Sequence, residues 1–317
     1  MVREIIIAVA LGILNTAFVS LSILGNTGGT NFGTALATLV FWILSLVPLF
    51  VSGLGYGVKS AAISVGTSAV IAALAIGVPF ALTYLGVAGL PVILLVRQAL
   101  LWRQGNGVTY WYPADRLLLW WAGICIILTG LAMALLGWDD AMRQGLIDGF
   151  DQMMAQVAEM QDAAPRMTGE AFVALIPQYM GPMWGLFILL SGCLAQGVLV
   201  RFKKNIRPTP ELSKMVLPQW LAIAFIGATV ASVLLDGTFP LLGAVEITLV
   251  ALFFLQGMAV IHVVSHRWNA RAAILGVIYV VTIMMLWMVL LIAILGLMET
   301  WVGFRRRFAP PPRQEED

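Results

Sequence analysis

One acidic side chain lies inside an apolar stretch of this sequence, where a charged group is unusual. Glu246 lies about two helical turns into the apolar run 240–263. A carboxylate within the hydrocarbon of a bilayer is costly unless it is paired, protonated or solvated by a cavity. The sequence places no cationic residue near it in the outer halves of the apolar runs. Glu246 is therefore a candidate for binding a proton, a cation or a ligand, and the alternative is a structural hydrogen bond.

Three amide side chains could accompany this carboxylate. Asn15 lies within the first apolar run, where a polar group must face another helix or a cavity. Asn26 and Asn31 lie in an uncharged, glycine-rich loop, 25–33, which could fold back and offer hydrogen bonds to a small solute. The loop could equally be a plain turn, and Asn15 could serve helix packing. Together with Glu246, these residues predict a solute pocket towards the outer side of a membrane.

The sequence lacks the motifs of several other chemistries. It has no glycine-rich phosphate loop ending in lysine and no H-E-x-x-H metal motif. His262 and His266 are four residues apart, but no carboxylate or cysteine nearby supplies a third metal ligand. Cys125 and Cys193 both lie in apolar runs and are expected to be core residues. We therefore expect no enzyme activity, no metal, no cofactor and no nucleic-acid partner.

The composition identifies the elements that must position these residues. Of 317 residues, 61% are hydrophobic and 11% are charged, whereas a soluble domain has about 45–50% apolar and about 25% charged residues. Apolar runs approach the ~20 residues that cross a bilayer, and they show no two-residue alternation. These runs are 5–24, 35–54, 59–77, 79–101, 117–137, 178–200, 216–235, 240–263 and 272–300. The predicted fold is an all-α polytopic transmembrane bundle of eight or nine spans, made only of helices and connecting segments, in contact with the lipid bilayer.

The charges predict an orientation for this bundle. Basic residues gather in the links 97–116, 201–214 and 263–271, whereas the link 138–176 is acidic. Because cytoplasmic loops are enriched in lysine and arginine, the N-terminus is expected in the cytoplasm and the protein in a bacterial inner membrane. Nine simple spans would place Arg305–Arg307 outside, so either one run does not cross or the last run is not a simple span.

Two further segments are predicted from their patterns. Residues 139–163 repeat apolar side chains every three or four positions between acidic ones, which indicates an amphipathic outer helix lying at the membrane surface. Residues 1–304 are expected to form a single transmembrane domain. Residues 305–317 are expected to form a disordered, polar and proline-rich tail.

Small residues recur at four-residue spacing in the first and third runs. The first run holds Ala8 and Gly12, and the third holds a longer stripe. The members of that stripe are Ala62, Gly66, Ala69 and Ala73. Such spacing lets helix backbones approach closely, either within the protein or against a membrane protein partner.

Three short stretches resemble a known group of proteins. The stretches 217–220 (LPQW), 256–259 (QGMA) and 296–305 (GLMETWVGFR) are similar to those of the YybS-like bacterial membrane proteins, which often have aspartate where this chain has Glu299. That family has been grouped by fold with the S components of energy-coupling-factor transporters, and MreD is a related comparison. The resemblance implies a helical bundle with a solute pocket under the first outer loop. It also implies that Ala8 and Gly12 could dock a coupling subunit.

These observations support two functions. The leading one is small-solute binding or a transport-related role, like that of an S component, through Asn15, Asn26, Asn31 and Glu246. The alternative is a non-transporting membrane scaffold, in the manner of MreD, that recruits envelope or division proteins through its small-residue stripes and basic inner links.

Overall fold

The computed structural model describes residues 2–25, 32–138, 140–161, 167–211, 215–235, 239–267 and 270–308, most of which are helical. Within these ranges, seven helices or continuous helical segments are long and apolar enough to cross a membrane, and three shorter helices are also apolar. The prediction of an all-α polytopic membrane protein is therefore confirmed.

The contacts divide the chain into two compact units, and the single transmembrane domain expected over 1–304 stays a prediction. The first unit comprises Met1–Ile124 and Met183–Pro210, and the second comprises Cys125–Pro182 and Glu211–Asp317. Two long helices, α6 (Ala114–Trp138) and α8 (Gly169–Arg201), contribute residues to both units. Each unit is described in turn.

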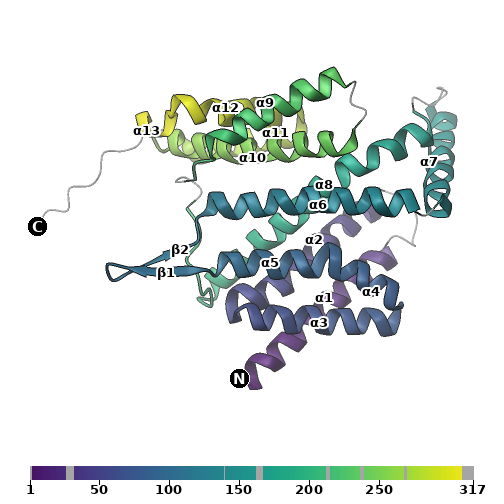
Figure 1. Ribbon diagram of the computed structural model, residues 1–317, viewed down its shortest axis with the longest axis horizontal. Helices are drawn as coiled ribbons and strands as arrows, with labels where there is room; N and C mark the ends of the chain where they lie inside the picture. Colours follow the sequence, from purple (N-terminus) through teal and green to yellow (C-terminus); the bar gives the residue numbers. More distant parts are fainter. Residues whose placement is uncertain are drawn as a thin grey trace, which may run out of the picture. The chain divides into compact units, whose positions relative to one another are not determined.

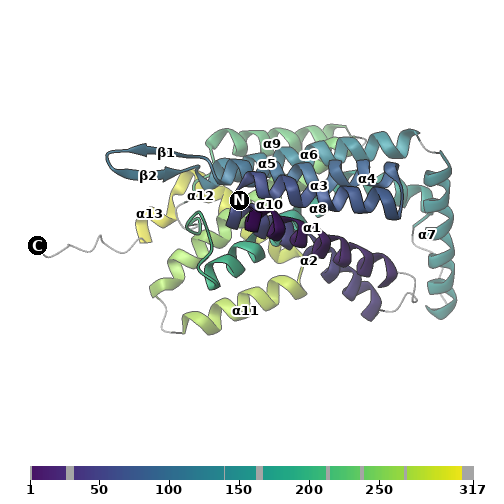
Figure 2. The same ribbon diagram turned by 90° about the horizontal axis from the view of Figure 1, so that it is seen from below.

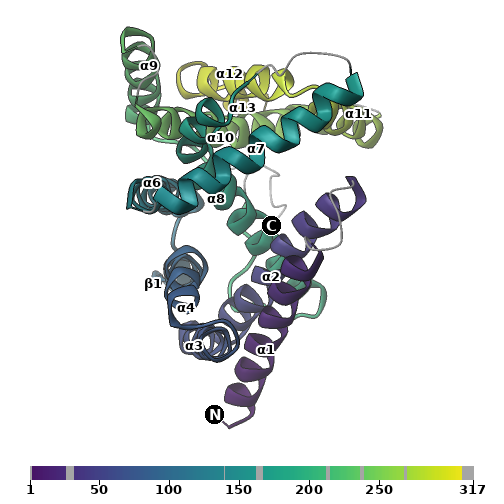
Figure 3. The same ribbon diagram turned by 90° about the vertical axis from the view of Figure 1, so that its right-hand side faces the viewer.

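The first unit is built on three long helical segments besides its parts of α6 and α8. They are α1 (Val2–Gly25), α2 (Phe32–Tyr56) and α3 (Val58–Ala75), followed by α4 (Val78–Tyr84), the π-helical turn η1 (Leu85–Gly89) and α5 (Leu90–Ala99). The last three form one continuous span, Val78–Ala99. Figure 3 shows α1 and α2 lying side by side, and α1 also packs against α3.

A β-hairpin separates α5 from α6, where the sequence predicts only a connecting segment. Strands β1 (Trp102–Gly105) and β2 (Val108–Trp111) pair antiparallel and extend past the end of α5 (Figures 1 and 2). The two turn residues, Asn106 and Gly107, have φ angles of 51° and 76°. The two-residue turn that matches the twist of the flanking strands requires a positive φ at both of its residues. The expectation of helices and connectors alone is thus wrong at this link.

The second unit contains the predicted outer helix. Helix α7 (Asp140–Gln161) runs crosswise to the neighbouring end of α6 (Figure 1), and its bounds confirm a helix within the segment predicted over 139–163. It is tied to the start of α8, because the rings of Phe150 and Phe172 stack at 4.1 Å and the Gly169 N–H donates to the Asp151 carboxylate at 2.6 Å. Met153 on its apolar face is 51% exposed, as expected for a helix that rests on a membrane surface.

The remaining elements of the second unit are helices. They are α9 (Gln219–Leu234), α10 (Pro240–Val264), the 3-10 turn η3 (Ser265–Arg267), α11 (Arg271–Met284), α12 (Trp287–Val302) and α13 (Phe304–Phe308). The run 272–300 is therefore not a simple span, because Met285 takes an extended conformation (φ −121°, ψ 93°) and separates two helices. At 1.5 Å per residue, each of these helices is about 20–25 Å long, slightly less than the hydrocarbon thickness.

The C-terminal tail begins later than predicted. Gly303, with φ 63°, ends α12 in the left-handed conformation, and α13 follows at once. Residues 305–308 thus belong to a helix, because Arg305 is held by buried contacts described below. Residues 309–317 lie outside the described residues.

Candidate functional site

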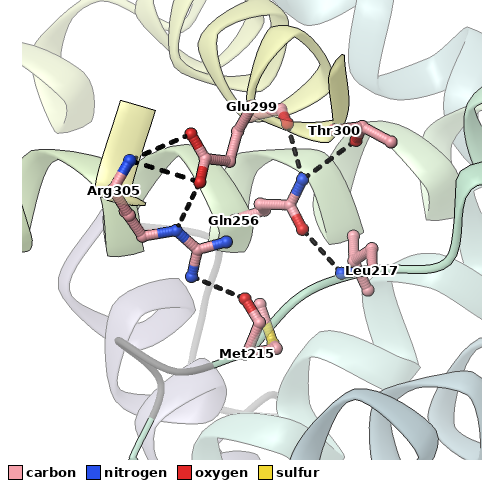
Figure 4. Close-up of polar contacts among 7 residues, drawn as sticks. Met215, Leu217, Gln256, Glu299, Thr300 and Arg305 are labelled. Carbon is pink, nitrogen blue, oxygen red and sulfur yellow. Dashed lines mark hydrogen bonds and ion pairs between the residues drawn. The ribbon is translucent and has the colours of Figure 1, made fainter. Parts of the chain in front are cut away.

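A buried glutamine joins three segments of the second unit. Gln256 on α10 is fully buried, and its Oε1 accepts a hydrogen bond from the Leu217 N–H at 2.8 Å (Figure 4). Its Nε2 donates to the Gly296 carbonyl at 2.7 Å and to the Thr300 hydroxyl at 3.1 Å. The amide therefore makes three bonds, which offsets the cost of burying it among apolar helices.

A buried ion pair lies beside this glutamine. The Arg305 Nε donates to a Glu299 carboxylate oxygen at 2.9 Å, and the two side chains are only 8% and 5% exposed. The Arg305 Nη1 also donates to the Met215 carbonyl at 2.6 Å (Figure 4). The turn at Gly303 brings the two partners face to face across the end of α12. A buried pair is tolerated when its geometry is good and further hydrogen bonds satisfy it.

Close helix packing makes this arrangement possible. Helices α10 and α12 cross at Gly257 and Gly296, where an added Cβ would overlap the backbone carbonyl oxygens of Ile292 and Phe253, respectively. Only glycine permits this approach, which brings Gln256 within reach of the α12 backbone. We call Gln256, Glu299, Thr300 and Arg305, with the backbone groups of Met215 and Leu217, the Gln256 cluster. Hydrogen bonds and the ion pair connect these groups, so the cluster suits a role in fixing the ends of α9, α10 and α12.

The Gln256 cluster brings together residues from three stretches that the sequence analysis singled out. Sequence reasoning treated 217–220, 256–259 and 296–305 as separate motifs and assigned them no site. The available signal was the polar Gln256 within an apolar run and the charged pair Glu299 and Arg305 six residues apart. The partners of Gln256 are 39 to 44 residues away in the chain, which the sequence does not reveal.

Glu246 lies on the same helix, α10, and is half-buried. Among the residues that the structure describes, no side chain forms a hydrogen bond or ion pair with its carboxylate. Glu246 therefore remains a candidate for binding a proton or a cation.

Asn15 is fully buried in the first unit, and both ends of its amide have internal partners. Its Nδ2 donates to the Ser45 carbonyl at 2.6 Å, and its Oδ1 accepts from the Tyr84 hydroxyl at 2.7 Å. These bonds tie α1 to α2 and α4 and support the alternative of helix packing. Asn26 and Asn31 lie outside the described residues, and Glu246 belongs to the other unit. That these four residues line one solute pocket therefore stays a prediction.

The small residues divide between the interior and the surface of the first unit. Ala8 is fully buried, and its carbonyl accepts a hydrogen bond from Ser64 at 2.7 Å. A Cβ at Gly12 would lie 2.6 Å from the Ser64 carbonyl oxygen, so α1 and α3 touch there. Ala69 is also buried, whereas Ala62 is exposed, Ala73 is half-buried and Gly66 has open space around its Cα. Ala8 and Gly12 thus serve internal packing.

Positive charge gathers at one end of the first unit. Its sequence holds nine basic residues and two acidic ones, Glu4 and Asp115. Direct contacts bring the links together at this end, since the Ile206 N–H donates to the Leu54 carbonyl at 3.2 Å. We call this end, with its nine basic residues, the basic end. These residues are Arg3, Lys59, Arg97, Arg103, Arg116, Arg201, Lys203, Lys204 and Arg207.

Arg207 fixes the base of the hairpin at the basic end. Its guanidinium is buried and donates to the Ala99 carbonyl at 2.9 Å and to the Tyr112 carbonyl at 2.7 Å. These carbonyls stand on either side of the hairpin, one at the end of α5 and one just after β2. Burial lowers the pKa of Arg207, and both bonds come from the charged guanidinium. The hairpin is therefore mounted on a rigid base.

The hairpin itself exposes aromatic and cationic side chains. Trp102 pairs with Trp111 across the strands, and Arg103 pairs with Tyr110, with its guanidinium 5.8 Å from the ring centre. Trp102 is 58% exposed and Tyr110 is 47% exposed. Sequence reasoning missed this element, although an Asn-Gly pair flanked by alternating aromatic residues is a strong hairpin signal.

Comparison with known proteins identifies the family. The chain matches, over residues 30–300, a family described as "Predicted membrane protein (DUF2232)". Because the match covers most of the chain, the protein belongs to this family. No curated protein and no solved structure matches it. The matched region covers most of both units and nearly all of the Gln256 cluster.

Proposed function

We propose that this protein is a membrane scaffold that docks an acidic protein partner on the hairpin of its basic end. The single observation that carries this proposal is the exposed hairpin, with Trp102, Arg103 and Tyr110 mounted on the buried Arg207. Aromatic residues and arginine are the types most enriched where proteins bind proteins, and they dominate the binding energy there. The alternative predicted from the sequence, a scaffold in the manner of MreD, agrees with this role.

The geometry of the hairpin suits a peptide partner. Its strands are short, and each has one edge without a strand partner among the described residues, so an extended segment could add to it. The excess of basic residues at the same end favours an acidic segment and would steer it to the hairpin.

The basic end also supports an orientation. All nine basic residues of the first unit gather there, so the rule that lysine and arginine mark cytoplasmic loops puts this end and the N-terminus in the cytoplasm. The membrane would be a bacterial inner membrane. If α11 and α12 each cross it, Arg305–Arg307 return to the cytoplasmic side and the discrepancy in the span count disappears.

Photo-crosslinking tests the docking proposal. A photoreactive residue replaces Val108, which is 54% exposed at the hairpin turn, and a control replaces Ile13, which is 52% exposed on α1. In intact membranes we expect one adduct of defined mass from position 108 only. The crosslinked segment, identified by mass spectrometry, should be acidic, and Arg103→Glu should abolish the adduct without changing the amount of protein. Identical adducts from both positions, or an adduct that is indifferent to Arg103→Glu, would refute docking.

A second function, small-solute binding or an S-component-like role in transport, is favoured by Glu246. Its half-buried carboxylate on an apolar helix could hold a solute cation. Native mass spectrometry of the purified protein should then reveal a bound solute that Glu246→Gln removes and that Glu170→Gln, at an exposed site on α8, retains. Protein without a bound solute, or a solute equally retained by Glu246→Gln, would refute solute binding. The scaffold role would then be the one proposal that remains.

A further inference from the structure

A pocket of about 400 Å³ opens at the basic end of the first unit. It lies where α1 begins, α2 ends and α3 begins, and its wall includes Glu4, Ile5, Tyr56, Lys59 and Ile63. All three helices are long and apolar enough to span a membrane. A bilayer that these helices cross would place the pocket at the depth of the lipid headgroups.

One side of the pocket is built to hold an anion. Lys59 stands in the first turn of α3, a helix of 18 residues whose start carries no side-chain cap. The N–H groups of such a turn and the positive end of the helix dipole attract phosphate groups. Gly57 takes φ 96° in the one-residue turn before α3, and nothing lies within 4 Å of the place where a Cβ would stand. Val58, Lys59 and Ser60 also line the pocket, so the first turn of α3 faces it.

The other side of the pocket supplies a carboxylate and an apolar wall. Glu4, in the first turn of α1, lines the same space as Lys59. Ile5 and Ile63 continue the wall towards the exposed apolar face of α1, where Ile6 is 62% exposed. A ligand that matches all three features has a phosphate, a cationic amine and a hydrocarbon part.

We propose that this pocket binds the headgroup of an aminophospholipid, such as phosphatidylethanolamine. Lys59 and the first turn of α3 hold the phosphate, Glu4 holds the ammonium group, and the acyl chains lie along the apolar face of α1. The site is independent of partner docking on the hairpin, and it would seat the first unit at a fixed depth in the bilayer.

Native mass spectrometry from nanodiscs tests the assignment. The discs contain equal amounts of phosphatidylethanolamine and phosphatidylglycerol, and the lipid retained by the protein is counted. We expect Lys59→Gln to reduce retained phosphatidylethanolamine about tenfold, as the loss of one charged hydrogen-bond donor implies. The matched control Arg116→Gln removes one exposed charge from the same end and should retain lipid as the wild type does. Glu4→Gln should abolish the preference for phosphatidylethanolamine over phosphatidylglycerol.

Competition with soluble ligands separates the possible sources of phosphate. Glycerophosphoethanolamine should displace the retained lipid, whereas inorganic phosphate at the same concentration should not. If inorganic phosphate displaces it equally well, the site takes free phosphate and the headgroup assignment is wrong. Equal lipid retention by Lys59→Gln and the wild type would also overturn it. Thermal unfolding verifies that each variant is folded, and Lys59→Met, which also removes the charge, replaces Lys59→Gln if that variant unfolds.

Discussion

The two units bury polar groups in different ways. The first unit holds neutral hydroxyls and amides between its helices, as in the chain Ser60, Ser52 and Ser64, joined by bonds of 2.7 Å. The second unit buries a full ion pair, Glu299 with Arg305, beside Gln256. The first unit is basic, with nine basic and two acidic residues, whereas the second has fourteen acidic and nine basic residues.

This difference shows where each unit is sensitive to change. A neutral hydrogen bond between membrane helices contributes about 0.6–1 kcal/mol, and its loss is tolerated. A buried charge that loses its partner is left in an apolar environment at a cost of several kcal/mol. The second unit should therefore depend on a few residues, and the first unit should spread its stability over many.

The largest expected effect is the loss of the buried arginine. Arg305→Leu leaves Glu299 buried without the guanidinium and should lower the free energy of unfolding by about 3–5 kcal/mol. Thermal unfolding in detergent measures the change, and Arg307→Leu, at an exposed position of α13, is the matched control. Glu299→Asp keeps the charge and should be milder. Equal unfolding midpoints for Arg305→Leu and Arg307→Leu would contradict the account.

The crossing of α10 and α12 should be the next most sensitive feature. Gly296→Ala places a Cβ on the Phe253 carbonyl oxygen and should destabilise the protein by about 1–3 kcal/mol through overpacking. Gly276→Ala on α11 has nothing within 4 Å and should be neutral or slightly stabilising, because alanine favours the helix. The same unfolding assay compares the two, and a neutral Gly296→Ala would mean that the helices do not meet there.

In the first unit, the strongest effect should be local. Arg207→Met removes both bonds that clamp the hairpin, at a cost of about 2 kcal/mol. Amide hydrogen exchange in residues 102–112 should accelerate, whereas Lys204→Met at an exposed neighbouring position should leave it unchanged. Unchanged exchange in Arg207→Met would show that the hairpin is held by other contacts.

The smallest effect should come from the neutral network. Tyr84→Phe removes the hydroxyl that bonds to Asn15 and should cost about 0.6–1 kcal/mol. The control is Tyr179→Phe, at an exposed position of α8. If Tyr84→Phe lowered the free energy of unfolding as much as Arg305→Leu, the two units would not differ in their sensitivity to the loss of a buried polar partner.

Some of this structure could be predicted from the sequence because it depends on local composition. The length of the apolar runs predicted the transmembrane helices, and the repeat of apolar side chains over 139–163 predicted α7. The hairpin could also have been found, since Asn106-Gly107 demands its turn. The break at Met285 has no such signal, because neither glycine nor proline marks it within 277–295.

The polar clusters could be predicted only in part. Asn15 was recognised as a buried polar residue, but its partners Ser45 and Tyr84 are 30 and 69 residues away. The same separation hides the partners of Gln256. A single sequence identifies the side chains that need a partner, whereas the fold decides which partner they find.

Cysteine labelling of the hairpin tests the central claim most directly, that the basic end docks a partner. Thr109→Cys, at an exposed position of β2, is treated with a water-soluble maleimide in inside-out membrane vesicles, before and after a high-salt wash. Salt screens the charges that hold an acidic partner. The account predicts slow labelling before the wash and fast labelling after it, equal to the rate of purified protein. Equal rates before and after the wash, both as fast as purified protein, would contradict it.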